Sequence, residues 1–508
     1  MIDKNFLIFK NSAILYVRLI VSSILGLFSA RFLLSGLGNS DFGLYNVVGG
    51  IVVMMAFFNS VMISTTNRFI AFETGKGNEE SINKIFNISL VLHIVIALLI
   101  LLFTETLGVF YVENYLNVDI SRVSDSIFVL RFSSYATIIT VISIPYQGVI
   151  TANENFLVRG MIEILRSFLA LGVAISLMLF VNDKIRLYSL LISIVNIIPA
   201  ILFFIYCAKK YPRIIKFNFQ KNKLKYKEML SFSSWNLIGA SAHLGKSTGA
   251  SLIINNFFGT ILNAAFGIAN QLNTIVLMFS MNLAQAAIPQ ITKSFSVGNK
   301  NRTLVLAAYI SKYTWYMMLI PALPLILETK YLLSLWLDTY PENTVIFCRL
   351  MIVGTLISGL GNGLSSVVEA SGKVKYFQIV LSTTSLLSLP IAYFVFFKGG
   401  NAYWIFIIII IANVINVIMS QILLRIIINF DVKYFLKTSF LKILYVLIMI
   451  CPLLIIHAFI PEGVMRFLVF STVTFLWTLF SIYMVGIDNN EKEILKGMIK
   501  KTLRLKKT

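Results

Sequence analysis

Residues 401–428 read NAYWIFIIIIIANVINVIMSQILLRIII, a stretch in which Arg425 is the only charged residue. A helix needs roughly 20 predominantly apolar residues to cross the hydrocarbon core of a bilayer, so this stretch is long enough to span a membrane. Similar apolar runs recur along all 508 residues of the chain. We therefore predict an integral membrane protein built from helices.

The apolar runs predict about fourteen transmembrane helices joined by short loops, and hence an all-α polytopic fold without a soluble domain. The composition agrees, because 58% of the residues are hydrophobic and 13% are charged, against roughly 45–50% and 25% in soluble domains. The predicted spans are 12–36, 42–66, 85–111, 126–151, 157–181, 185–208, 230–255, 262–288, 304–327, 343–370, 374–397, 401–428, 436–460 and 463–487.

The formal net charge of +21 is explained by where the basic residues lie. We assign 30 of the 43 lysines and arginines to the side that holds both termini and the loops after even-numbered spans, 6 to the opposite side and 7 to the spans. The positive-inside rule then predicts that both termini are cytoplasmic. The surplus favours contact with anionic membrane lipids over binding of nucleic acid.

An internal repeat divides the chain into two lobes. FGLYN at 42–46 and FGIAN at 266–270 lie 224 positions apart, and VITA at 149–152 is echoed by VVEA at 367–370. Because each lobe contains an even number of spans, both lobes have the same orientation in the membrane. The predicted segments are an N-terminal six-helix lobe (1–208), a basic cytoplasmic loop (209–229), a C-terminal six-helix lobe (230–430), two extra helices (431–490) and a basic cytoplasmic tail (491–508).

Basic residues inside spans are the first functional candidates, because an ionisable group in the membrane is costly and usually faces a bundle interior or a cavity. Arg18 shares a polar face of the first span with Ser22, and Lys246, the most central basic residue of the chain, shares a polar face of the seventh span with His243. For these two cations we favour a functional role over helix packing. Arg31 and Lys312 lie near span ends, where snorkelling to the interface explains them.

Three further ionisable residues are candidates for an ion-coupling site. Glu163 lies three residues before Arg166 and can neutralise it, so a structural pair and a coupling pair both remain open. His93 is a lone imidazole in an apolar run, which is more often a satisfied core residue than a proton carrier. Glu369 closes the tenth span, where it can pair with a lysine.

Uncharged and imidazole side chains form polar stripes on the first two spans of each lobe. Such residues either line a cavity or pack one helix against another. As cavity-lining candidates we select Ser22, Asn46, Ser60, Ser64, Asn236, His243, Asn263, Asn270 and Gln285.

Motifs of enzymes are missing from the sequence. We find no P-loop, no HExxH helix and no GxSxG turn. Cys207, Cys348 and Cys451 are scattered, which indicates neither a metal site nor a disulfide. We therefore expect transport rather than catalysis, with no metal and no cofactor.

Four segments carry a resemblance to a known family: GLGNSDFGLYNVVGGIV (36–52), TTNRFIAFETGKGN (65–78), IPYQGVITANE (144–154) and NNFFGTILNAAFGIANQLNTIV…MNLAQAAIPQITKSFSVGNK (255–300). They resemble the polysaccharide-biosynthesis flippases, which export lipid-linked oligosaccharides or O-antigen repeat units. This family belongs to the multidrug/oligosaccharidyl-lipid/polysaccharide (MOP) superfamily. The resemblance covers essentially the whole chain, and 255–300 is its most specific part.

This resemblance implies twelve core helices in two bundles around a central cavity, two extra C-terminal helices and alternating access. The implied substrate is undecaprenyl-diphosphate-linked oligosaccharide, moved from the cytoplasmic to the outer leaflet of a bacterial inner membrane for surface polysaccharide, O-antigen or lipopolysaccharide biosynthesis. Other polysaccharide-assembly proteins are the implied partners. Since the family's cavity is cationic, Arg18 and Lys246, with Arg31 and Arg166, would bind the diphosphate here.

Two alternatives remain. A multidrug or organic-cation antiporter of the same superfamily would share the fold, but cation export calls for an acidic residue in the cavity. The first two spans of each lobe contain none except Asp41 near the outer end of the second. A membrane glycan polymerase or glycosyltransferase would need large external loops or an acidic pair on one face.

Overall fold

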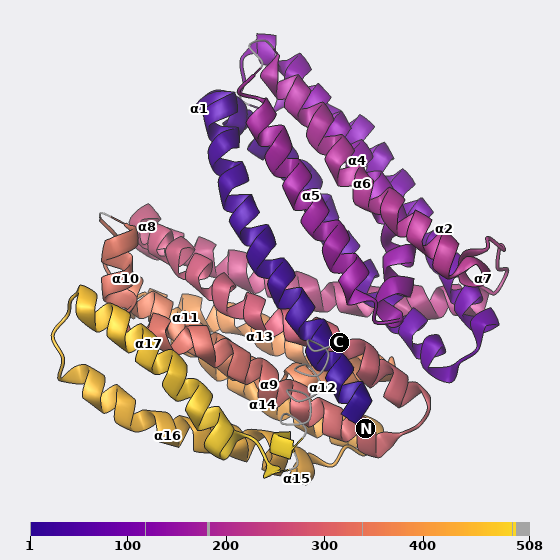
Figure 1. Ribbon diagram of the computed structural model, residues 1–508. Helices are drawn as coiled ribbons and strands as arrows, with labels where there is room; N and C mark the ends of the chain where they lie inside the picture. The colour runs from indigo at the N-terminus through magenta and orange to yellow at the C-terminus, as the bar shows by residue number, and fades with distance from the viewer. Residues whose placement is uncertain (1, 117, 180–182, 338, 490, 494–508) are drawn as a thin grey trace, which may run out of the picture. The chain divides into compact units, whose positions relative to one another are not determined.

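The computed structural model describes the chain except residues 1, 117, 180–182, 338, 490 and 494–508 (Figure 1). Every regular element in the described part is a helix, which confirms the predicted all-α class. In chain order the elements, with η for a π-helical turn, are α1 (Ile2–Lys76), α2 (Glu79–Phe103), η1 (Thr104–Gly108), α3 (Val109–Asn114), α4 (Ile120–Ala152), α5 (Phe156–Ser176), α6 (Lys184–Lys210), α7 (Pro212–Ile215), α8 (Lys223–Ser296), α9 (Lys300–Leu327), α10 (Thr329–Trp336), α11 (Thr344–Gly359), α12 (Asn362–Ser371), α13 (Lys375–Phe397), α14 (Trp404–Ile428), α15 (Val432–Phe435), η2 (Leu436–Phe440), α16 (Leu441–Ala458), α17 (Val464–Ser481) and η3 (Ile482–Gly486).

The helices are compatible with fourteen crossings. By length and composition, ten helices of the described chain can cross a membrane, or eleven when the bent pair α11–α12 is taken as one span. That count treats α8 as one span, although its 74 residues would extend about 110 Å at 1.5 Å per residue, enough for two crossings. It also omits the part of α1 after Gly38, and α5, which is 21 residues long but contains three charged side chains.

Two long helices reveal the repeat more clearly than the sequence does. The 75-residue α1 is broken at Gly38, with φ 76° and ψ 170°, and the 74-residue α8 is broken at Gly259, with φ 78° and ψ −177°. Glycine adopts a positive φ with little strain, which explains this residue at both breaks. The two glycines are 221 positions apart, close to the offset of 224 between the FG motifs.

The chain forms two compact units. The N-terminal unit consists of residues 10–234, and the C-terminal unit consists of residues 235–508 together with 1–9. The division falls inside α8, after Ser234, so the first residues of this helix pack with the N-terminal unit. There Ser233 Oγ lies 2.8 Å from Thr65 Oγ1, and the Phe232 and Phe69 rings meet edge to face with centroids 5.7 Å apart.

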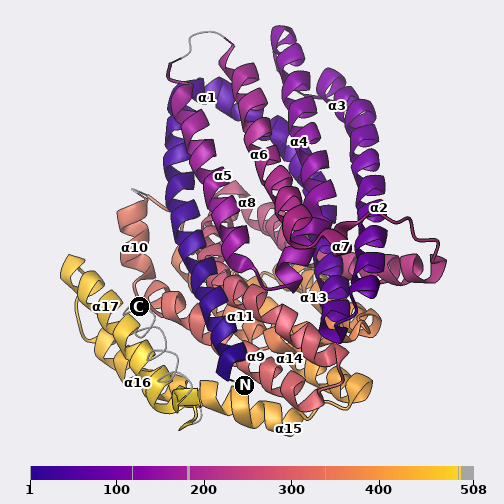
Figure 2. The same cartoon turned by 45° about the vertical axis from the view of Figure 1, so that its right-hand side comes forward.

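Within the N-terminal unit, α4 packs against α6 and α2, as both views show (Figures 1 and 2). Gly148 of α4 permits a close approach to α1, because a Cβ at this position would lie 2.8 Å from Thr66 Cγ2. An apolar core follows the outer part of these helices, where Val48, Val129 and Ile185 are almost fully buried. Close packing of apolar side chains thus holds α1 against α4 and α6.

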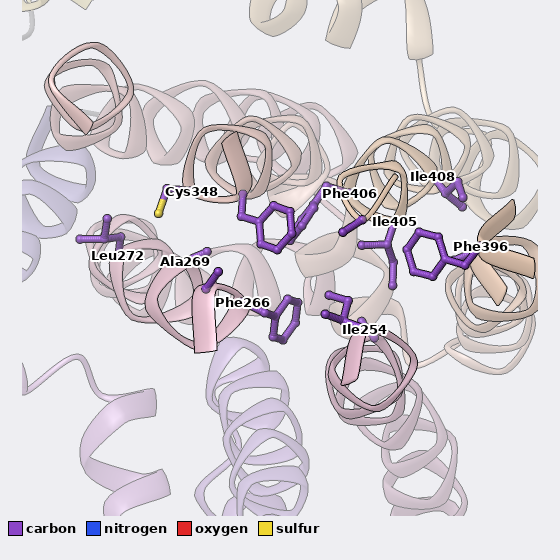
Figure 3. Close-up of a cluster of buried hydrophobic side chains, with 14 of the residues drawn as sticks. Ile254, Phe266, Ala269, Leu272, Cys348, Phe396, Ile405, Phe406 and Ile408 are labelled. Atoms are coloured by element: carbon purple, nitrogen blue, oxygen red, sulfur yellow. The ribbon is translucent and has the colours of Figure 1, made fainter. Parts of the chain in front are cut away.

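The C-terminal unit has an apolar core on both sides of the Gly259 break (Figure 3). Ile254 precedes the break and Phe266 follows it, and both pack with Phe396 of α13 and Phe406 of α14 in one cluster. The Phe266 and Phe406 ring centroids are 5.9 Å apart. This cluster holds α8 against α13 and α14, which is the arrangement on which the candidate site depends.

Helices α16 and α17 are joined to α9 by buried charged groups. Lys312 of α9 is fully buried, and its Nζ donates to both carboxylate oxygens of Glu491 at 2.7 and 2.8 Å. At the C-terminal end of α9, buried Glu328 accepts from His457 of α16 at 2.7 Å and from Arg466 of α17 at 3.1 Å. The prediction that Lys312 snorkels to the interface is wrong, because a carboxylate 179 residues away neutralises it inside the protein.

Candidate functional site

A cavity of about 350 Å³ lies inside the C-terminal unit, between α8 and helices α11 to α14. Its volume lies within the range of roughly 300–1,000 Å³ that is typical of small-molecule pockets. The axes of α11 and α12 meet at 44°, and Gly361 at this bend lines the cavity. Ser365 and Glu369 of α12 also line the cavity.

One wall of the cavity is a single face of α8. Gly239, Ala242, His243 and Lys246 line it, and their spacing of three, four and seven residues places them on one side of a helix. The small residues leave room for the two longer side chains. Helical periodicity predicted a shared face for His243 and Lys246, and the structure brings both to the same cavity.

Lys246 is half-buried in this wall. Among the described residues, no ion pair or hydrogen bond involves its ammonium group, although the residue lines the cavity. A partly desolvated cation gains free energy when it meets an anion or strong hydrogen-bond acceptors. Lys246 is therefore suited to hold a negatively charged group of a ligand.

The other walls carry amides, hydroxyls and one acid. Gln378 of α13 and Asn413 and Asn416 of α14 line the cavity together with Glu369 of α12. Gln378 Nε2 donates to Asn236 Oδ1 at 3.0 Å, so Asn236 orients a lining residue from just outside. Their side-chain amides can donate to or accept from a polar ligand.

Asn416 leaves one hydrogen-bonding group of the cavity unused. Its Nδ2 donates to Ser385 Oγ at 3.0 Å, whereas its buried Oδ1 has no partner among the described residues. An unsatisfied buried acceptor costs about 1–3 kcal/mol, so a donor from a ligand or from water would be stabilising here. No group of three or more metal-ligating side chains comes together in the described part of the chain.

Arg18, the corresponding candidate of the N-terminal unit, has a different environment. It forms an ion pair with Glu163 of α5, which also accepts from Arg159 Nε at 3.0 Å. Ser167 of α5 donates to Ser22 at 3.2 Å, so the polar face of α1 packs against α5. The cluster of two arginines and one glutamate keeps one net positive charge. Helix periodicity on α1 alone did not predict the Glu163 partner, because that residue belongs to another helix.

The other ionisable candidates are dispersed. Glu163 pairs with Arg18 and Arg159, so the predicted pair with Arg166 is wrong; Arg166 is exposed and donates to Asn196 at 3.3 Å. Arg31 is exposed on α1. His93 is fully buried and its Nδ1 lies 2.7 Å from the Ser89 carbonyl oxygen, the environment of a core imidazole.

The uncharged candidates also lie apart. Asn263 accepts from Ser251 Oγ at 2.7 Å, and Ser64, Asn270 and Gln285 are half-buried. None of these four lines the cavity of the C-terminal unit. The side chains of Asn46 and Ser60 lie outside the described residues.

The amide wall was not predicted, because polar faces were sought only on the first two spans of each lobe. A signal was present in the later spans. Asn413, Asn416 and Ser420 follow one face of α14, an otherwise strongly apolar helix, and Gln378 and Ser382 do the same on α13.

No protein-family model matches the chain, and no curated protein matches it. Several solved structures match the chain. A crystal structure of a mutant MATE aligns with a TM-score of 0.72 at 14% identity, over 83% of this chain and 95% of that one. An outward-facing multidrug resistance MATE family transporter of the MOP superfamily aligns with 0.70 at 12% identity, over 83% and 94%.

A third structure is a MOP superfamily transporter from Pyrococcus furiosus, described as having a binding pocket of reverse polarity that suggests a different function. It aligns with a TM-score of 0.67 at 14% identity, over 83% of this chain and 95% of that one. The chain therefore has the fold of the MATE transporters of the MOP superfamily. This confirms the superfamily fold that the sequence resemblance implied, and at such identities the likeness is one of fold.

Proposed function

We propose that this protein is a membrane transporter that moves a diphosphate-linked oligosaccharide lipid to the outer leaflet of a bacterial inner membrane by alternating access. The cargo serves surface-polysaccharide biosynthesis, both termini are cytoplasmic, and other polysaccharide-assembly proteins are the expected partners. The protein acts as a flippase and not as an enzyme. The MATE-like fold supports transport, and the charge of the candidate sites supports the class of cargo.

The observation that carries this proposal is Lys246, a cation that lines the cavity of the C-terminal unit without an anionic partner among the described residues. A diphosphate that leaves water needs fixed positive charge and hydrogen-bond donors. The arginine-rich cluster around Arg18 adds a second positive region in the other unit. Helix packing alone requires neither feature.

The negative charge of the proposed cargo also supplies a driving force for its export. Each negative charge that moves outward across an inside-negative membrane gains about 2.3 kcal/mol per 100 mV. A diphosphate with two charges would gain roughly 4–5 kcal/mol per 100 mV, less the part that is neutralised by protein cations moving with it. The potential could therefore drive export, and a proton or sodium ion could serve to reset the empty carrier.

Proteoliposomes that contain a lipid-linked diphosphate glycan test the proposal. A potassium potential set by valinomycin, without a proton or sodium gradient, should move the lipid toward the positive compartment. In cells, deletion of the gene should cause lipid-linked glycan intermediates to accumulate, which mass spectrometry of the lipid extract would detect. Absence of both transport and accumulation would reject the proposed cargo.

Export of organic cations is the second candidate function. Glu369 lines the same cavity as Lys246 and supplies the acidic group that such cargo requires. Under this alternative, the proteoliposomes would accumulate a lipophilic cation such as tetraphenylphosphonium in response to a proton or sodium gradient. The Glu369→Gln variant would abolish that accumulation, whereas Lys246→Met would leave it intact or increase it.

A further inference from the structure

The cavity of the C-terminal unit is lined by two side chains with unused hydrogen-bonding groups among the described residues, one a donor and the other an acceptor. Lys246 has three donors and a positive charge on the α8 wall, and Asn416 has an unused acceptor on the α14 wall. A single ligand satisfies both only if it is anionic at one end and carries a hydrogen-bond donor at the other. The cavity is thus asymmetric in the chemistry that it can bind.

Hydroxyl-bearing side chains extend the Asn416 side of the cavity. Ser382 and Ser385 of α13 and Ser420 of α14 line it, together with the amide of Gln378. Amides and hydroxyls both donate and accept, which is the pattern needed for neighbouring hydroxyl groups on one ring. Ser385, Ser420 and Gln378 each have one partner inside the protein and keep further hydrogen-bonding capacity for a ligand.

A metal or organic cation is a poor fit to the same space. Lys246 occupies one wall as a charge of the same sign, and no cluster of three metal-ligating side chains occurs among the described residues. Glu369 is a single acid and faces this cavity together with a lysine and a histidine. Lys246 therefore favours a ligand that brings an anionic group to the α8 wall.

We propose that this cavity is a subsite for the sugar that is attached directly to the diphosphate of the cargo. Lys246 binds a phosphoryl oxygen, Asn416 Oδ1 accepts a hydrogen bond from a sugar hydroxyl, and Gln378 and the serines bind the remaining hydroxyls. The proposal rests on the proposed function and sharpens it, because it assigns recognition of the first sugar to a cavity built by one unit alone.

The subsite makes recognition depend on the first sugar as well as on the phosphates. A site built to hydrogen-bond a substrate hydroxyl discriminates strongly against a ligand that lacks it, because the protein group then stays unpaired. Loss of the Asn416 acceptor should therefore weaken binding of sugar-bearing lipids selectively. Loss of Lys246 should weaken binding of every diphosphate lipid.

Two lipids and three variants of the full-length protein in nanodiscs test this inference. The probes are a short-chain polyprenyl diphosphate with one N-acetylhexosamine and the same polyprenyl diphosphate without sugar. Asn416→Leu should weaken binding of the sugar-bearing lipid about tenfold, equivalent to 1.4 kcal/mol, and leave binding of the bare diphosphate within twofold. Lys246→Met should weaken both at least tenfold.

Asn273→Leu is the matched control. Asn273 belongs to the same unit and also has a buried Oδ1 without a partner among the described residues, but it lies outside the cavity. It should change neither affinity. A thermal-unfolding curve for each variant confirms that the protein is folded.

The inference is overturned if Asn416→Leu weakens both lipids equally or neither, or if Lys246→Met leaves the bare diphosphate bound as in the wild type. Either result leaves the proposed function intact when wild-type proteoliposomes still transport the glycan lipid. If the wild type neither binds nor transports that lipid, the proposed function itself fails, and the inference fails with it.

Discussion

Two lysines of the C-terminal unit lie in transmembrane helices and have opposite surroundings. Lys312 of α9 is fully buried, and Glu491 holds its ammonium group at 2.7 Å. Lys246 of α8 is half-buried, lines a cavity and has no such partner among the described residues. The comparison teaches that a charge inside the membrane indicates function only after its partners are known, because a compensated charge can be wholly structural.

The packing around the two lysines differs in the same way as their charge partners. Around Lys312, Tyr313 donates to Glu491 at 3.1 Å, and Tyr316 donates to the Gly486 carbonyl at 3.0 Å, which secures Gly486 and Glu491 to α9. Around Lys246 the neighbours are small residues and amides that leave space. One site is filled by the protein, and the other is left for a ligand.

The largest expected effect is a loss of stability on removing Lys312. Lys312→Ala leaves the buried carboxylate of Glu491 uncompensated, so we expect a loss of about 3–5 kcal/mol and a large fall in Tm in detergent. The double variant Lys312→Met with Glu491→Leu should recover most of that loss, since it removes both charges. Equal melting temperatures for the single and double variants would contradict the structural role.

The next effect is a loss of transport at unchanged stability. Lys246→Met removes a partly desolvated cation without a partner, so Tm should stay the same or rise, while transport in proteoliposomes should fall at least tenfold. Lys246→Arg keeps the charge and should retain part of the activity. If Lys246→Met unfolds the protein as Lys312→Ala does, the contrast between the two lysines disappears.

Arg18 should behave in an intermediate way, because its partner Glu163 is shared with Arg159. Arg18→Ala makes its cluster with Arg159 and Glu163 neutral, and we expect reduced export with a stability loss of about 1 kcal/mol. Adding Glu163→Gln restores one net positive charge and should restore part of the export. The test is the initial transport rate of the wild type, the Arg18→Ala variant and the double variant. If the double variant transports no faster than Arg18→Ala, the role of Arg18 is geometric.

The smallest effect belongs to an exposed pair of the same unit. Lys330 Nζ lies 3.2 Å from Glu462, with side chains 60% and 47% exposed. Lys330→Ala should change stability by less than about 1 kcal/mol, because water and salt screen the pair. A fall in Tm as large as that of Lys312→Ala would show that burial does not determine how much each lysine contributes to stability.

The all-helical class of the fold could be predicted because membrane helices satisfy their backbone hydrogen bonds internally and must be apolar over a known length. The shared face of His243 and Lys246 was predictable for a similar reason, since helical periodicity places residues three apart on one side. The FG motifs lie 224 positions apart, close to the 221 positions that separate the Gly38 and Gly259 breaks.

Composition and periodicity alone thus determined that this protein is a bundle of membrane helices with polar stripes on particular faces. Tertiary structure decided which charges are neutralised and which remain available. Glu163 lies 145 residues from Arg18 and Glu491 lies 179 residues from Lys312. It also decided that α13 and α14 face α8 across a cavity. The physical reason is that periodicity is a local property of one helix, whereas ion pairs and cavities arise from packing between helices that are distant in sequence.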